Sequence, residues 1–359
     1  MSIELLTINR VRIIKRAEIQ PSPSVNLITG PNAAGKTSLL EAIDILSRGR
    51  SFRTHLAERL VSSGQSELTV TARLRPSEGA SLSIGLEKSR RGARIHIQGS
   101  PAQSIAELAS LLPVQALHPE SHQLIQGGPT YRRAYLDWGT FHVKRQFLPI
   151  WRRYQRSLHQ RNAALKAADE PKNIRVWHGE LSETGECIDN FRREYVHALM
   201  PVINEYVEKL PSVNQPTFSY QSGWPEAQSL AALLEREISA DIQRGYTRYG
   251  PHRAELEIRV NGRYAHGIVS RGQQKLLAAT MRLAQTQLFT QQTARACVIL
   301  VDDLPAELER VYRERLLHAL SQLDAQLFIT AIEADDLNMG MWPDVKRFHV
   351  EQGDIQELV

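Results

Sequence analysis

The pattern of hydrophobic and polar positions changes along the chain and predicts different structures for different regions. In the first third, short apolar runs and polar–apolar alternation, as in SELTVTARLRP, SLSIGLEK and ARIHIQGS, predict strands of an antiparallel sheet. One segment differs, because Leu39, Leu40, Ile43 and Leu46 recur at helical spacing in KTSLLEAIDILSRG and Gly49 is a stop signal. We therefore expect strands around one helix.

From Thr130 the pattern becomes helical. Trp151 and Tyr154 recur at helical spacing, which places them in a core rather than against nucleic-acid bases. Further helices are predicted through ELSETGECIDNFRREYVHALMPVINEYVEKL and AQSLAALLEREISADIQRG, with a loop bracketed by Pro211 and Pro216 between them.

Strand patterns return near residues 255–260 and alternate with helical patterns to the end. QQKLLAATMRLAQTQLFTQQ predicts a long helix, CVILVDD a buried strand and RFHVEQGDIQEL a hairpin. Strands at both ends of the chain indicate one α/β domain built from residues 1–125 and 250–359. Residues 126–249 would then form an inserted, mostly helical lobe.

Composition narrows the picture only slightly. The chain has 359 residues, of which 42% are hydrophobic, and 44 Lys and Arg against 39 Asp and Glu. This mild basic excess permits a nucleic-acid partner without requiring one. Cys187 and Cys297 show no metal-ligand spacing and indicate plain thiols in a reducing compartment. No signal peptide or apolar membrane span is recognisable, so we expect a cytoplasmic protein with no membrane partner.

The segment GPNAAGKTS matches the phosphate-loop pattern G-x-x-x-x-G-K-[ST], follows the apolar strand VNLIT and opens a helix. Glycines allow the backbone N–H groups to point at phosphate oxygens, and the helix N-terminus adds partial positive charge. Lys36 is expected to reach the β- and γ-phosphates of ATP, and Thr37 to bind Mg²⁺. The alternative is a chance glycine-rich turn. The expected ATP-contacting residues are Gly30, Pro31, Asn32, Ala33, Ala34, Gly35, Lys36, Thr37 and Ser38.

Two adjacent carboxylates end the apolar run CVILVDD. In a nucleotide site Asp302 would hold Mg²⁺ through water, and Asp303 would polarise the attacking water. Asp303 and Lys36 are therefore the catalytic candidates. The alternative is an ordinary strand-to-turn boundary, where Asp is common.

The segment SRGQQKL places Ser270, Gly272 and Gln273 at the head of the long predicted helix. Such an N-terminus can bind an anion, and because the chain already has a phosphate loop, this turn would contact nucleotide held by another subunit. The arrangement resembles the S-x-G-[QE] signature with which ATP-binding-cassette ATPases complete a site across a dimer. The alternative is a plain N-capped helix.

Several motifs together carry a closer resemblance. NLITGPNAAGKTSLLEAI, GRSFRT, GGPTYRRAYLDWG, YGPHRAEL, SRGQQKLLA and VDDLPAELE resemble the RecF family over essentially the whole chain. The resemblance implies an ABC-type ATPase head, a P-loop fold with a mixed sheet and an antiparallel subdomain, with an inserted helical lobe and no long coiled coil. It also implies an ATP-induced homodimer with weak DNA-dependent ATPase activity. Such a protein binds double-stranded and gapped DNA and helps RecO and RecR load RecA at single-strand gaps.

The sequence departs from the family pattern at a few positions. Lys275 stands where Arg is common, and Ala254 where the family is more acidic. Ala306 and Glu309 replace the usual Ser and Asp in a loop that faces the partner subunit in cassette dimers. Asp303 takes a place that many cassette ATPases give to Glu, and its shorter carboxylate fits slow turnover.

The helical middle carries many cations, and a basic helix face would bind DNA phosphates in a salt-dependent, sequence-tolerant way. The alternative is a solvated helix face, and Arg132 and Arg133 could instead be structural residues of the GGPTYRR turn. The DNA-binding candidates are Arg132, Arg133, Arg152, Arg153 and Arg156, with Lys144, Arg145 and Arg161 in the same region.

Six further residues are candidates by position, as the resemblance places them. Ser51 and Arg53 follow the phosphate-loop helix, and Gln115 could contact the metal or water and link the ATP site to the lobe. His252 and Arg253 form a second candidate cluster. Thr330 lies where relatives have a γ-phosphate-sensing residue.

Two other functions remain open from the sequence alone. One is a DNA clamp that needs nucleotide only for folding. The other is the ATPase subunit of a transporter, which would pair with separate membrane chains.

Overall fold

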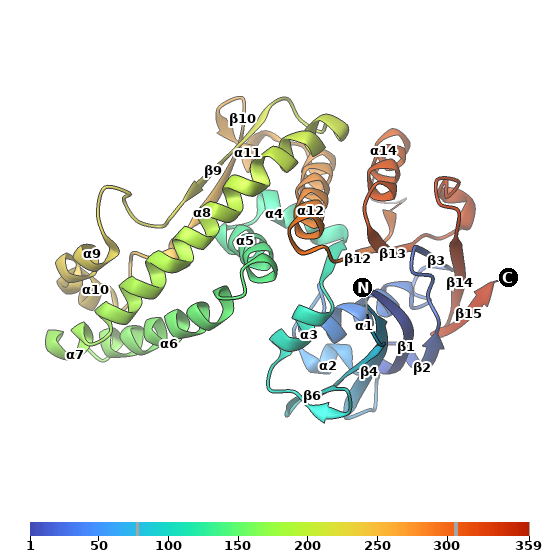
Figure 1. Ribbon diagram of the computed structural model, residues 1–359, viewed down its shortest axis with the longest axis horizontal. Helices are drawn as coiled ribbons and strands as arrows, with labels where there is room; N and C mark the ends of the chain where they lie inside the picture. The colour runs from blue at the N-terminus through green and yellow to red at the C-terminus, as the bar shows by residue number, and fades with distance from the viewer. Residues whose placement is uncertain (77–78, 305–307, 359) are drawn as a thin grey trace. The chain divides into compact units, whose positions relative to one another are not determined.

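The computed structural model describes residues 1–76, 79–304 and 308–358 (Figure 1). The chain forms two compact units, of which the first comprises Met1–Ser121, Tyr206–Leu210 and Lys275–Val359 and the second His122–Glu205 and Pro211–Gln274. No helix among the described residues is long and apolar enough to cross a membrane.

The first unit contains two six-stranded sheets. One is wholly antiparallel and has the order β2 (Ile14–Ile19), β1 (Ser2–Val11), β4 (Glu67–Arg75), β5 (Leu82–Ser89), β6 (Gly92–Ile97) and β7 (Ser100–Pro101). The other has the order β15 (Asp354–Leu358), β14 (Val345–Glu351), β3 (Val25–Thr29), β13 (Ala325–Thr330), β12 (Cys297–Val301) and β8 (Val114–Leu117). It is parallel except for β15, so it is the mixed sheet that the family resemblance implies.

Helix α1 (Lys36–Arg48) contacts strands of both sheets and is buried on nearly every side. Its apolar residues Leu39, Leu40, Ile43 and Leu46 are fully buried, and its polar residues Glu41, Asp44 and Ser47 are buried as well because each has a hydrogen-bond partner. The helix ends at Gly49, whose φ of 67° suits the left-handed C-cap. The other helices of this unit are α2 (Ala57–Leu60), α3 (Ile105–Leu111), most of α12 (Arg271–Thr293) and α14 (Arg310–Ser321).

The second unit is mostly helical. Its helices are α4 (Gln123–Gln126), α5 (Pro129–Val143), α6 (Phe147–Lys166), α7 (Pro171–Arg175), α8 (His178–Lys209, whose last residues belong to the first unit), α9 (Leu230–Arg236), α10 (Ile238–Arg244) and α11 (Ala265–Ile268). Tyr154 is buried in a core with Leu158, Leu181, Ile188 and Leu230, as helical spacing predicts.

This unit also contains a three-stranded sheet of β11 (Arg263–Tyr264), β10 (Glu255–Val260) and β9 (Pro216–Gln221). The loop predicted between Pro211 and Pro216 is present, and β9 begins at Pro216, in a segment for which the sequence pattern predicts no strand. Because β10 pairs with β9, residues 250–274 join the second unit, whereas the hydrophobic pattern assigns them to the head.

Candidate nucleotide-binding site

The loop between β3 and α1 has a backbone that few side chains tolerate. Gly30 has a φ of 143°, and a Cβ at this position would collide with the carbonyl oxygen of Val350 on β14. Gly35 has a φ of 119°, and between them Ala33 adopts a left-handed φ of 63°. Glycine is the residue that reaches such conformations without steric cost. The glycine spacing of the motif is therefore required by the local geometry.

Strand β14 and the turn after it support this loop. The N–H of Gly353 donates to the carbonyl of Ala34 at 2.8 Å. The Thr29 hydroxyl, one residue before the loop, donates to the carbonyl of Phe348 at 3.3 Å. The loop thus rests on strand β14, far away in the sequence.

The inner face of the loop offers backbone donors. In the described part of the chain, the N–H groups of Ala33, Gly35, Lys36, Thr37 and Ser38 have no acceptor. The last three belong to the first turn of α1, where the helix supplies no partner. Free N–H groups at a helix N-terminus form an anion site, so this loop can hold phosphate groups.

Lys36 is the first residue of α1, and its side chain reaches back to the loop. Its Nζ donates to the carbonyls of Gly30 at 2.6 Å and Pro31 at 2.9 Å. Burial lowers the pKa of Lys36, while the nearby charges of Asp303 and Asp302 oppose this shift. A cation thus lies between the loop and the acidic end of β12, as expected of a lysine that contacts a triphosphate.

Four residues from three elements converge at the end of the parallel sheet. The Thr37 hydroxyl lies 2.9 Å from Oδ1 of Asp302, and the Thr330 hydroxyl donates to the same oxygen at 3.1 Å. The N–H of Asp303 donates to Thr330 Oγ1 at 2.7 Å. Thr330 is fully buried and ties both acidic residues to β13, a role that sequence reasoning missed because the partners are separated in the chain.

The two carboxylates have different surroundings. Burial raises the pKa of Asp302, whereas hydrogen bonds from Thr37 and Thr330 lower it. Asp303 has a left-handed φ of 54°, and its buried Oδ1 has no hydrogen-bond partner among the described residues. A strained residue with an unpartnered buried oxygen is typical of a functional site.

A magnesium ion fits this donor set. The hydroxyl of Thr37 and the carboxylate of Asp302 are hard oxygen ligands next to the phosphate loop, as Mg²⁺ prefers when it binds together with a nucleotide.

The segment after α1 contains two candidates. Burial raises the pKa of Asp302, and the positive charge of Arg53 is the last of the effects that oppose this shift. Ser51 has another role, because its hydroxyl donates to the buried Glu41 at 2.6 Å. Arg12 makes a bidentate pair with the same carboxylate at 2.8 and 3.0 Å. The carboxylate of Glu41 on α1 thus connects this helix to the segments that contain Arg12 and Ser51. No pattern in the sequence indicates this contact.

Gln115 does not fit a metal ligand. Its side chain is buried, its Nε2 donates to Gln285 at 2.7 Å, and its Oε1 accepts from Arg282 at 2.9 Å. Both ends of the amide are therefore occupied within the first unit. The expectation that Gln115 contacts the metal and links the site to the lobe is corrected accordingly.

The SRGQQ turn belongs to the second unit. The Ser270 N–H donates to Oε1 of Gln273 at 3.1 Å, and the Gln273 N–H lies 3.4 Å from Ser270 Oγ. This reciprocal pattern is a capping box at the start of α12. Ser270, Gly272 and Gln273 are all exposed, so the turn is accessible to a ligand from outside the chain. Ala306, where the family pattern has Ser, lies outside the described residues.

The candidate DNA-binding arginines differ widely in exposure. Arg132 is nearly buried, with a bidentate pair to Glu255 at 2.7 Å and a bond to the Gly127 carbonyl. Arg133 donates to the Ala254 carbonyl at 2.9 Å. Both side chains hold the start of α5 to β10 and the residue before it, in agreement with the structural alternative stated above.

Arg161 is fully buried, so the expectation that it belongs to a DNA-binding helix face is wrong. Its guanidinium donates to Asp241 at 2.8 Å and Thr247 at 2.7 Å. A buried charge needs such partners. If the Arg161 guanidinium moved out to bind DNA, the buried carboxylate of Asp241 would lose its counter-ion.

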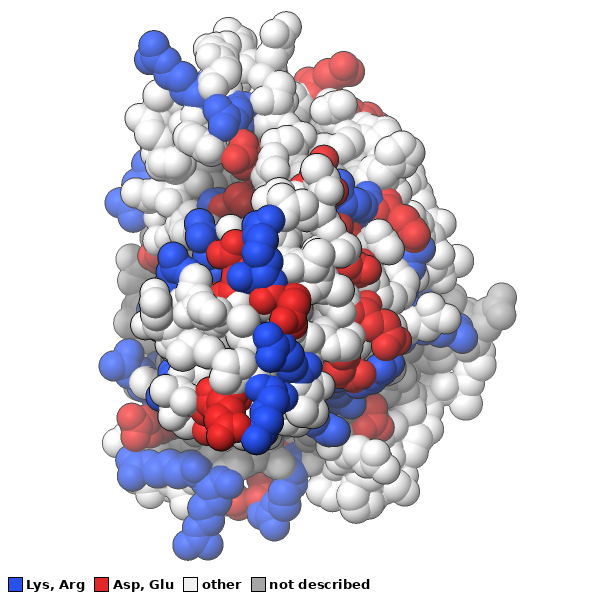
Figure 2. All heavy atoms as spheres, turned by 90° about the vertical axis from the view of Figure 1, so that its left-hand side faces the viewer, with Lys and Arg blue, Asp and Glu red and all other residues white. Residues whose placement is uncertain are grey.

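The exposed arginines of α6 also separate into two kinds. Arg153 makes a bidentate pair with Glu180 and lies 3.8 Å from Glu183. Arg152 and Arg156 are exposed and form no ion pair among the described residues. Figure 2 shows Lys and Arg intermixed with Asp and Glu on the face of the molecule that it views.

His252 is a half-buried structural residue. Its Nε2 lies 3.0 Å from the Thr247 carbonyl, which can only accept, so Nε2 carries the proton and Nδ1 accepts from the Tyr154 hydroxyl at 2.5 Å. Burial lowers the pKa of His252 to about 4. Arg253 is exposed and lies over the Tyr246 ring, 5.0 Å from its centroid.

Fold and site together define an ATP-binding-cassette-type ATPase head of the SMC class. A family model described as the RecF/RecN/SMC N terminal domain matches residues 2–354. The DNA replication and repair protein RecF of Thioalkalivibrio sulfidiphilus is 39% identical over 357 residues, 99% of each chain. The chain belongs to the RecF family.

Solved structures agree on the fold. The recombination mediator protein RecF-ATP of the RecFOR pathway matches with a TM-score of 0.89 at 24% identity, over 100% of this chain and 98% of that chain. The Smc head domain with an extended coiled coil from Pyrococcus furiosus matches with a TM-score of 0.58 at 14% identity, over 99% and 96%. The predicted head with a helical lobe and no long coiled coil is confirmed.

Proposed function

We propose that the chain is an ATP-dependent DNA-binding protein of recombinational repair and replication-fork maintenance, acting in the cytoplasm. The observation that carries the proposal is the convergence of Lys36, Thr37, Asp302, Asp303 and Thr330 at the phosphate loop. Free backbone donors would hold the phosphates, Lys36 would neutralise them, and Thr37 with Asp302 would hold Mg²⁺.

Hydrolysis in this proposal is slow and depends on Asp303. Its buried, unpartnered Oδ1 is the oxygen available to accept a hydrogen bond from an attacking water.

The nucleotide site is completed by a second copy of the chain. The exposed Ser270–Gln273 turn presents a capped helix N-terminus, which suits the γ-phosphate of nucleotide bound to a partner subunit. ATP would then join two heads, and hydrolysis would release them.

The closed dimer would bind double-stranded and gapped DNA and help RecO and RecR load RecA at single-strand gaps. The relative from Thioalkalivibrio sulfidiphilus is a DNA replication and repair protein, which supports this role. On the second unit, the free cations Arg152 and Arg156 are the favoured phosphate contacts, because Arg132 is paired with Glu255 and Arg153 with Glu180.

The test is ATP-dependent dimerisation, measured by light scattering with and without gapped DNA. Lys36→Arg and Ser270→Arg should each abolish the dimer. Mixing the two variants should restore part of it, because the mixed dimer has one intact composite site. Ser229→Arg is a matched control, since Ser229 is another exposed helix cap of the second unit. Normal dimerisation of Ser270→Arg would refute the composite site.

Phosphate release in the same samples separates this proposal from a clamp that only needs nucleotide to fold. A clamp would bind ATP and DNA tightly with no phosphate release, whereas the proposed cycle releases phosphate at a slow, DNA-stimulated rate.

A further inference from the structure

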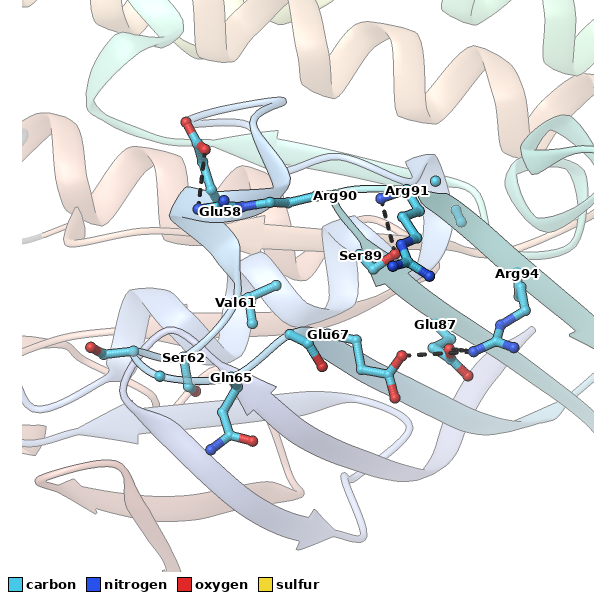
Figure 3. Close-up of a pocket in the computed structure, with 15 residues that line it drawn as sticks. Glu58, Val61, Ser62, Gln65, Glu67, Glu87, Ser89, Arg90, Arg91 and Arg94 are labelled. Atoms are coloured by element: carbon cyan, nitrogen blue, oxygen red, sulfur yellow. Dashed lines mark hydrogen bonds and ion pairs between the residues drawn. The ribbon is translucent and has the colours of Figure 1, made fainter.

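A large polar pocket lies on the antiparallel sheet of the first unit (Figure 3). Its volume is about 1010 Å³, and its walls are α2, the loop 61–66 and the hairpin of β5 and β6. Val61 and Ala93 are the non-glycine apolar residues among its described lining residues, and the rest are serines, glutamine and charged residues. Small-molecule pockets are mostly apolar, so this lining indicates a polar or charged ligand.

The hairpin turn supplies three arginines in five residues, in the sequence RRGAR. Arg94 pairs with Glu87 and lies 3.7 Å from Glu67, and Arg90 lies 3.6 Å from Glu58, as Figure 3 shows. These ion pairs hold two of the guanidinium groups in place on the pocket wall.

Three arginines in and around the pocket lack such partners. Arg91 lines the pocket. Arg59 follows the lining residue Glu58 in α2, and the backbone carbonyl of Arg10 accepts a hydrogen bond from the N–H of the lining residue Ser62. All three are exposed and form no ion pair within the described ranges. The three lining glutamates balance the three lining arginines in formal charge, and Arg91 is the lining arginine without an ion pair among the described residues.

The opposite wall adds neutral donors. Gly64 has a left-handed φ of 76°, and a Cβ there would meet no atom within 4 Å, so the turn is open. The N–H groups of Ser63 and Gly64 have no acceptor in the part of the chain that the structure describes. Successive free N–H groups in a turn with a left-handed residue form a concave anion site.

We propose that this pocket is a second nucleic-acid contact, which holds phosphate groups of the DNA backbone between Arg91 and the 62–66 turn. Guanidinium groups and backbone N–H groups are the usual donors to DNA phosphates. The proposal deepens the proposed DNA-binding function and rests on it. It assigns part of the DNA contact to the ATPase head, whereas Arg152 and Arg156 are on the second unit.

The test is binding of a fluorescein-labelled DNA duplex to the full chain with ATP, followed by anisotropy at several salt concentrations. Each phosphate contact contributes about 0.9 to the slope of log K against log salt, which is about fivefold in affinity at ~0.15 M salt. We expect Arg91→Gln to weaken binding about fivefold and lower the slope by about one. Arg59→Gln combined with it should enlarge both effects.

Two further variants test the chemistry. Arg73→Gln is the matched control, because Arg73 is exposed and unpaired among the described residues and lies on β4 of the same sheet but not in the pocket lining. It should bind like the wild type. Glu58→Gln frees Arg90 and removes a negative charge, so it should bind DNA more tightly, which a merely structural role for the pocket would not produce.

The outcomes separate the two proposals. If the wild type binds the duplex and the Arg91→Gln, Arg59→Gln double variant binds with the same affinity and salt slope, the pocket contact is refuted and the function stands. That result would instead favour an acidic protein segment as the occupant. If the wild type with ATP does not bind the duplex, both proposals are refuted.

Discussion

The hydroxyl of Thr37 lies 2.9 Å from Oδ1 of Asp302, although 265 positions separate the two residues in the chain. Thr330 donates to the same oxygen from another strand. The carboxylate is therefore held by one hydroxyl on the phosphate-loop helix and another on the neighbouring strand. Its orientation is set before any ligand is bound, which lowers the cost of binding a metal.

Replacing Thr330 should disturb the acidic pair without touching nucleotide. Thr330→Val removes the hydroxyl that contacts Asp302 and accepts from the Asp303 N–H, at a cost of about 1 kcal/mol for each lost hydrogen bond. We expect ATP affinity in the presence of Mg²⁺ to fall several-fold, with little change in EDTA. Thr330→Ser keeps the hydroxyl and should restore the affinity. Equal losses with and without Mg²⁺ would contradict this role.

Asp303→Asn should separate hydrolysis from binding. Asn is isosteric and tolerates the left-handed backbone of this position, so the fold should be kept. Loss of the base should slow phosphate release by about 100-fold or more, while the ATP-induced dimer persists longer. Single-turnover phosphate release and light scattering measure the two effects. Wild-type hydrolysis in the variant would exclude Asp303 as the base.

The arginines of α6 should contribute unequally to DNA binding. Arg152→Gln with Arg156→Gln removes two free cations and should lower the salt slope by about two. Arg153→Gln removes a cation that Glu180 already neutralises and should change DNA affinity little. Anisotropy titrations with one duplex give the affinity and the salt slope of the wild type, of the double variant and of Arg153→Gln. A larger loss from Arg153→Gln than from the pair would reverse this assignment.

Arg161 should matter for stability and not for DNA. Arg161→Met leaves Asp241 as an unpaired buried charge, which should lower the free energy of unfolding by about 3–5 kcal/mol. Arg153→Met breaks an exposed ion pair and should cost less than about 1 kcal/mol. Urea unfolding measures both. Similar costs for the two variants would show that Asp241 finds another partner.

His252 predicts how stability depends on pH. Its pKa is lowered to about 4 in the folded chain, so the unfolded chain binds more protons between about pH 6.5 and 4. The contribution of neutral His252 to the free energy of unfolding is fully present above about pH 6.5. It is lost as pH falls through this window, by at most about 3 kcal/mol. His252→Gln should flatten the profile relative to the wild type in urea unfolding at several pH values. His159→Gln is the control, because His159 is exposed.

The parts of the fold that sequence predicts best are those with local causes. The phosphate loop and α1 are recognisable because Gly30, Gly35 and Gly49 each meet a backbone requirement within a few residues. Strand β9 was missed because its first residue, Pro216, is typical of a loop, whereas pairing with β10 decides the structure.

The parts that sequence predicts poorly depend on distant partners. Arg161 reads as an exposed cation until Asp241, 80 positions later, is placed beside it. Gln115 reads as a free polar ligand until Gln285 and Arg282 are found to occupy its amide. Long-range hydrogen bonds of this kind leave no mark in a single sequence.

The support that β14 gives to the phosphate loop has a consequence for biosynthesis. Thr29 bonds to Phe348, 319 positions later, and Gly30 lies against the carbonyl of Val350. During translation the loop motif leaves the ribosome early, but the strand beside it emerges only near the end. We therefore expect the loop to reach its ATP-binding conformation only when synthesis is almost finished, and fragments lacking β14 to bind ATP poorly.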